Sequence, residues 1–130
     1  MNDSGASDPI PAELDGAALE RLRELDPQGR NGLLPRVMTT YLNSLTRILG
    51  QLEAEAARPD AETVARLAHQ LKSSSASVGA QALARAAAEV ERALRAGDTA
   101  DPGEAIARLL REGRAAAASV DAMLVSLSRP

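Results

Sequence analysis

Residues 33–52 read LLPRVMTTYLNSLTRILGQL, and apolar side chains recur in them at intervals of three and four residues. This period matches one face of an α-helix, in which successive residues are about 100° apart. The apolar positions of this stretch are Leu34, Val37, Met38, Tyr41, Leu45, Ile48 and Leu52. We predict a long helix from about residue 33 to residue 57, whose apolar face is covered by other helices because strand-favouring residues are sparse in the chain.

Similar apolar stripes lie on both sides of this long helix. They predict one short helix within residues 14–25 and three longer helices at about 61–77, 80–96 and 102–127. Segments rich in Pro, Gly and Asp separate these stretches, as loops do. The predicted fold class is therefore all-α: an antiparallel up-down four-helix bundle with a short extra N-terminal helix, spanning residues 13–127. Residues 1–12 are expected to be a flexible lead-in.

Individual residues mark several of the predicted helix ends. Asp60 and Asp101 stand where an N-cap is expected, and Pro102 occupies the first position of the last helix. Gly113 interrupts that helix, as a residue without a side chain does where a second helix comes close.

Composition excludes several classes of function. The chain has 130 residues, enough for one domain, and its net charge of −3 does not suit a nucleic-acid surface. It has no cysteine and a single histidine, too few ligands for an ordinary zinc site. No apolar run approaches the roughly 20 residues that cross a bilayer, and the polar N-terminus does not resemble a signal peptide. We expect a cytoplasmic monomer that binds no nucleic acid, no membrane, no metal and no other cofactor.

The stretch AHQLKSSSASVGA at residues 68–80 contains the single histidine, His69, and the single lysine, Lys72. Helical geometry places His69 about 150° from the centre of the apolar face, so it is predicted to face water. Arg66 and Ser73 share its side of the helix, and Lys72 lies on the flank.

Two interpretations of this stretch remain open from the residues alone. A lone exposed histidine is commonly a solvated residue without a task, and a flanking lysine commonly covers apolar surface with its stem. Four serines within residues 73–77 are poor helix formers, which indicates a need either for close packing or for open access to the ring. A neutral imidazole is also a nucleophile that can take a phosphoryl group, and a lysine one turn away would offset the charge of that group.

The stretch resembles the histidine-containing phosphotransfer (HPt) domains of two-component phosphorelays. The matching letters are His69, Leu71, Lys72, Ser73, Ser74, Ser75, Ala76, Gly79 and Ala80. The resemblance implies that His69 accepts a phosphoryl group from an aspartate of one receiver domain and passes it to another. It also implies that Lys72 is the supporting cation and that Gly79 is the family's glycine at the turn after the site. Arg66, Ser73, Ala76 and Gly79 would then provide access and docking.

The chain departs from the family pattern at two positions. Ser73 stands where many members have glycine, and it is small enough to preserve access. Some members have a glutamine on the next helix that orients the histidine ring, and the spacing leads to Glu91 here. Glu91 could accept a hydrogen bond from the ring, with Arg95 offsetting its charge, or it could be a surface residue paired with Arg95 at i, i+4. The sequence leaves both interpretations open.

By this resemblance the partners are receiver (response regulator) domains and a hybrid sensor histidine kinase, with magnesium expected on the receiver only. The chain has no motif for an ATP site, so it is expected to carry phosphoryl groups without being a kinase. One alternative is a helical adaptor that docks receiver or kinase domains without being phosphorylated. Another is an adaptor regulated by phosphorylation of the serines between Ser73 and Ser77.

Overall fold

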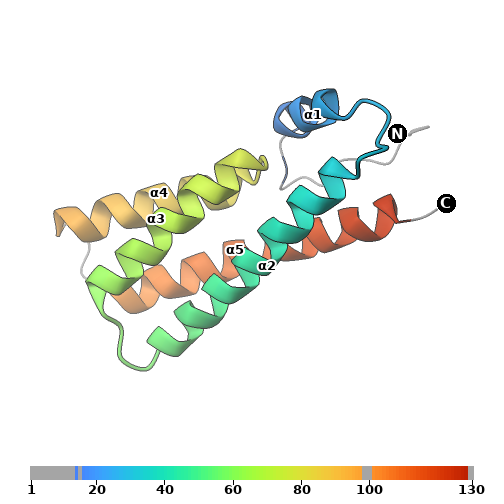
Figure 1. Ribbon diagram of the computed structural model, residues 1–130. Helices are drawn as coiled ribbons and strands as arrows, with labels where there is room; N and C mark the ends of the chain where they lie inside the picture. The colour runs from blue at the N-terminus through green and yellow to red at the C-terminus, as the bar shows by residue number, and fades with distance from the viewer. Residues whose placement is uncertain (1–13, 15, 98–100, 129–130) are drawn as a thin grey trace, which may run out of the picture.

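The computed structural model describes residues 14, 16–97 and 101–128, and these residues form five α-helices without any strand. The predicted lead-in, residues 1–12, lies outside the described residues. The helices are α1 (Gly16–Leu25), α2 (Leu33–Glu55), α3 (Ala61–Ser77), α4 (Gln81–Ala96) and α5 (Pro102–Leu127) (Figure 1). Each predicted helix is present, and the largest boundary differences are two residues, at the start of α1 and at the end of α2. The all-α fold class is confirmed.

Helices α2 to α5 alternate in direction and form an antiparallel bundle (Figure 1). The most extensive contacts join α3 to α4 and α2 to α5, and further contacts join α4 to α5 and α2 to α3. The short helix α1 packs against α2. Within the described part of the chain, no helix combines the length and the apolarity that crossing a membrane requires.

The core is made by the apolar stripes that the sequence shows. All the stripe residues of α2 are buried except Val37, which packs against the core from its edge. The one tyrosine of the chain, Tyr41, is also buried, and its hydroxyl group lies 2.8 Å from that of Ser75 on α3. This hydrogen bond satisfies two polar groups that would otherwise be unpaired in the core. Ser75 therefore serves packing between α2 and α3 rather than access to the surface.

The predicted caps begin α3 and α5. The Asp60 carboxylate accepts hydrogen bonds from the backbone N–H of Thr63 at 3.0 Å and from its hydroxyl group at 2.7 Å. Asp101 accepts from the N–H groups of Gly103 and Glu104, at 2.9 and 3.3 Å. These contacts satisfy N–H groups that have no partner inside the helix.

Asp26 caps the N-terminus of α2, a contact that the sequence analysis missed. Its buried carboxylate reaches across the loop after α1 and accepts hydrogen bonds from the backbone N–H groups of Asn31 and Leu33, at 3.2 and 3.1 Å. Gly32, the residue before α2, has a left-handed backbone with φ of 63°. Asp26 lies seven residues before Leu33, whereas Asp60 and Asp101 directly precede the helices that they cap. A search for capping residues next to the predicted helix starts therefore misses Asp26.

Gly113 marks a close approach of two helices, as predicted. It is buried on α5, and a Cβ atom at this position would overlap the side chain of Leu49 on α2. The missing side chain thus lets α2 and α5 pack closely.

Candidate functional site

His69 lies in the middle of α3, on the side away from the core. The opposite face of α3 is buried and consists of Val64, Ala65, Leu67, Ala68, Leu71 and Ser75. The His69 side chain is 56% exposed, so the imidazole meets solvent as helical geometry predicted.

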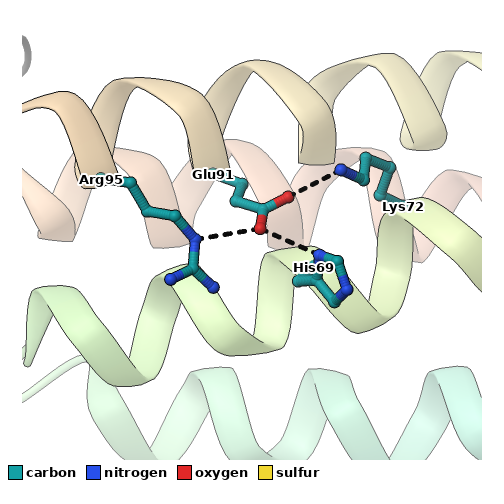
Figure 2. A network of polar contacts seen from close by, with 4 residues as sticks. All are labelled: His69, Lys72, Glu91 and Arg95. Atoms are coloured by element: carbon teal, nitrogen blue, oxygen red, sulfur yellow. Dashed lines mark hydrogen bonds and ion pairs between the residues drawn. The ribbon is translucent and has the colours of Figure 1, made fainter.

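The centre of the site is Glu91 on α4, whose carboxylate contacts three side chains (Figure 2). Its Oε2 atom lies 2.9 Å from Nδ1 of His69 and accepts a hydrogen bond from Nε of Arg95 at 3.0 Å. Its Oε1 atom lies 2.9 Å from Nζ of Lys72. The contact with the histidine ring is therefore present, and so is the pairing with Arg95 at i, i+4, but Glu91 is buried and is not the surface residue of the second interpretation.

The contact with Glu91 decides which ring nitrogen is free. An ionised carboxylate has only acceptor atoms, so Nδ1 of His69 carries the hydrogen and donates it. The neutral ring then has its lone pair on Nε2. Figure 2 shows this second nitrogen on the far side of the ring from Glu91. The geometry thus presents one nucleophilic nitrogen and holds the other in a hydrogen bond.

Glu91 stays ionised although it is nearly buried, with 11% of its side chain exposed. The hydrogen bond from Lys72 lowers the pKa of Glu91 most strongly, and those from Arg95 and His69 lower it further, while burial acts in the opposite direction. Two cations thus compensate one shielded anion. With a neutral ring, the four side chains carry one net positive charge, which favours an incoming anion.

Lys72 contacts the carboxylate and not the histidine ring. Its ammonium group and Nδ1 of His69 bind different oxygen atoms of Glu91. The carboxylate of Glu91 therefore lies between the ammonium group and the imidazole. The Lys72 side chain is 41% exposed, and its flexible stem allows the ammonium group to turn towards an anion on the ring.

The other predicted site residues divide into two groups. Arg66, Ser73 and Ala76 are exposed on the face of α3 that bears His69. Gly79 is buried instead, so it adds no open surface for docking. Its backbone is left-handed, with φ of 82°, and the N–H groups of Gly79 and Ala80 bond to the carbonyl groups of Ala76 and Ser75. This pair of bonds is the Schellman motif, in which glycine ends a helix.

The remaining serines are paired within the helix. The hydroxyl groups of Ser74 and Ser77 donate to the carbonyl groups of Gln70 and Ser73, at 3.0 and 3.1 Å. Such bonds to the preceding turn satisfy serine in a helix interior. The described residues contain no group of three or more His, Asp or Glu side chains suited to a metal ion.

Comparison with known proteins identifies the family of the chain. The family model of the Hpt domain matches residues 36–124, which include α3, α4 and every residue of the Glu91 network. The chain belongs to the Hpt domain family, and its role is histidine phosphotransfer in phosphorelays. Its relay partners are of the kind that this family serves, such as receiver domains and kinases. No curated protein matches the chain.

Solved structures show the same fold. The histidine-containing phosphotransfer protein HptB from Pseudomonas aeruginosa superposes with a TM-score of 0.74 at 23% identity, over 88% of this chain and 96% of that one. ZmHP2, a histidine-containing phosphotransfer protein from maize, gives a TM-score of 0.71 at 25% identity, over 91% of both chains. The bundle is thus the fold of phosphotransfer proteins from a bacterium and from a plant.

Proposed function

We propose that His69 is the phosphoacceptor of this domain and that Nε2 is the nitrogen that takes the phosphoryl group. The observation that carries this proposal is the ring itself: it is exposed, and Nδ1 is held by Glu91 at 2.9 Å. The donor is an aspartyl phosphate of one receiver domain, and the acceptor is an aspartate of another. In the first transfer the Nε2 lone pair forms a P–N bond, the P–O bond to the aspartate breaks, and the aspartate leaves with the electron pair.

The residues around His69 have distinct parts in this proposal. Glu91 orients the ring, Lys72 turns to the phosphoryl oxygens, and Arg95 keeps the charge of Glu91 balanced. The exposed Arg66, Ser73 and Ala76 form the surface on which a receiver docks. The receiver brings the magnesium ion, so the domain itself uses no cofactor and is a phosphoryl carrier rather than an enzyme.

The proposal also covers the setting of the domain. A hybrid sensor histidine kinase is the source of the phosphoryl groups, and the domain acts as a monomer in the cytoplasm. A monomer leaves the face of α3 that bears His69 free for each receiver in turn, as a relay requires.

Transfer from a labelled receiver tests the assignment of His69. The chain and its His69→Gln variant are incubated with a receiver domain carrying a labelled aspartyl phosphate. We expect acid-labile label on the natural chain and none on the variant, with unchanged circular dichroism showing that both are folded. Label that persists in His69→Gln would place the phosphoacceptor elsewhere.

The two alternatives have less support. An adaptor that is never phosphorylated would have His69 buried or blocked by Arg66 or Arg95. The His69 side chain is instead 56% exposed, and Arg95 is bound to Glu91. Regulation through the serines of α3 has less support because Ser75 is fully buried and the hydroxyl groups of Ser74 and Ser77 are bonded to backbone carbonyl groups, although Ser73 and Ser77 are exposed.

A further inference from the structure

The ring of His69 is held by the carboxylate of Glu91, at the position where some members of the family that the sequence resembles have the uncharged amide of a glutamine. Both groups accept a hydrogen bond from Nδ1–H, so orientation of the ring alone needs no charge. We propose that Glu91 keeps Nδ1 of the phosphorylated His69 ring protonated, so that the phosphoryl group leaves from a protonated ring and passes on rapidly. This inference rests on the proposed function of His69.

The reason lies in the leaving group of the second transfer. When the aspartate of the next receiver attacks phosphorus, the P–N bond breaks and its electron pair returns to Nε2. If Nδ1 is protonated, the group that leaves is neutral imidazole. If Nδ1 has lost its proton, the leaving group is the imidazolate anion, which is a far stronger base and a much poorer leaving group. A proton kept on Nδ1 therefore makes the phosphoryl group mobile, and its loss makes the phosphoryl group long-lived.

The charges of the site favour the protonated ring. Lys72 and Arg95 carry two positive charges and Glu91 one negative charge, and each cation binds an oxygen of Glu91 at 2.9 to 3.0 Å. A phosphoryl group on Nε2 adds about two negative charges at neutral pH. The site then has a net charge of about −1 with a neutral ring and about zero with a protonated ring. Arg66 and Glu62, one and two turns before His69 on α3, are exposed charged residues of opposite sign on the same face of the helix.

The position of Glu91 strengthens its effect on the ring. Its Oε2 atom is 2.9 Å from Nδ1, and only 11% of its side chain is exposed, so water screens the contact weakly. Hydrogen bonds with an ionised partner are about twice as strong as neutral ones. Lys72 and Arg95 keep the pKa of Glu91 low, so the carboxylate remains charged at the pH values where an imidazole titrates.

Phosphoramidate can test this inference without any receiver, because it phosphorylates histidine directly. The full chain, Glu91→Gln and a control variant are labelled on His69, and the loss of label is followed from about pH 6 to about pH 9, a range that spans imidazole titration. The control is Glu89→Gln. Glu89 also lies on α4 and also binds an arginine, Arg108, at 2.6 Å, but it is 51% exposed and has no contact with His69 among the described interactions.

We expect the natural chain and Glu89→Gln to lose label with the same pH profile. In Glu91→Gln the ring loses its proton at a lower pH, so the midpoint of the profile moves down by about one pH unit. Above neutral pH its label then lasts about five- to tenfold longer, whereas at the acid end all three proteins agree. The ¹⁵N chemical shift of Nδ1 in the labelled protein near pH 8 gives an independent readout of the proton.

Several outcomes would overturn the inference. Identical profiles for Glu91→Gln and the natural chain would do so while leaving the phosphoacceptor role intact, because that role is tested by transfer from a receiver. A folded Glu91→Gln variant that takes no label would also overturn it, since Glu91 would then be needed for acceptance of the phosphoryl group. If the natural chain takes no label on His69 from either donor, the proposed function fails and the inference fails with it.

Discussion

At the scale of single residues, the site depends on one carboxylate that links two helices. Helical periodicity alone placed His69 on the exposed side of α3, because exposure follows from the turn of one helix. It could not decide whether Glu91 meets His69 or only Arg95. That contact depends on the position of α3 along the axis of α4 and on the rotamers of both side chains. The apolar period of one helix determines neither of these. Both partners were nevertheless identified as candidates from the sequence.

Lys72 provides a prediction at this scale. Lys72→Met keeps a long apolar stem but removes the ammonium group that binds Oε1 of Glu91 at 2.9 Å. We expect transfer from a phosphorylated receiver to His69 to slow about five- to tenfold, because a charged contact at a half-exposed site is worth on the order of 1 kcal/mol. The measurement is the initial rate of labelling, with Arg111→Met on α5 as a matched removal of an exposed cation. An equal rate for Lys72→Met and the natural chain would show that the lysine gives no charge support.

At the scale of elements, helix positions were predictable and helix ends partly so. The stripes of α2 to α5 and the caps Asp60 and Asp101 are local signals, since the interacting residues are at most four apart. Asp26 caps α2 from across a loop, and Tyr41 bonds Ser75 on another helix 34 residues along the chain. Neither pairing has a local signature. Tertiary contacts of this kind are the part of the fold that sequence reasoning missed.

The same substitution should have opposite effects at two glycines. Gly79 needs its left-handed backbone to end α3, so Gly79→Ala is expected to lower the free energy of unfolding by about 1 kcal/mol. Gly50 lies inside α2, where an added Cβ meets no atom within 4 Å. Gly50→Ala should therefore raise the free energy of unfolding by roughly 0.5–1 kcal/mol. Urea denaturation of the two variants checks both signs, and a loss of stability in Gly50→Ala would contradict the assignment of an open helical site.

At the scale of the whole molecule, the bundle combines two closely packed helix pairs. One pair, α3 and α4, carries the entire His69 site. In the other pair, α2 and α5 pack closely against each other at Gly113. The hydrogen bond between Tyr41 on α2 and Ser75 on α3, the helix that bears His69, joins the two pairs through the core. A chain almost without aromatic residues thus has its one tyrosine at the contact between its two halves.

Removal of this hydroxyl group should reveal its contribution. Tyr41→Phe leaves the buried Ser75 hydroxyl group without its partner, and we expect the free energy of unfolding at pH 7 to fall by about 1 kcal/mol. Burial raises the pKa of Tyr41, and the bond to Ser75 lowers it to a smaller extent. A raised pKa means that the folded state holds the proton more tightly, so this stabilisation is complete below the ordinary tyrosine value of about 10 and declines above it.

Urea denaturation at pH 7 and at about pH 11 tests this dependence, since the second value lies above the ordinary tyrosine range. The difference between the natural chain and Tyr41→Phe should shrink at the alkaline value. The single variant Ser75→Ala and the double variant provide the comparison, because removal of both hydroxyl groups should cost less than the sum of the two single changes. A difference that grows with pH would contradict the assigned burial of the phenol.

The single lysine has a practical consequence. Its ammonium group binds Glu91 beside the His69 ring, and all other basic side chains except His69 are arginines. A reagent that acylates primary amines consequently has one side-chain target in this protein, and that target lies within the site. Footprinting of Lys72 can therefore follow the occupancy of this surface without an introduced probe.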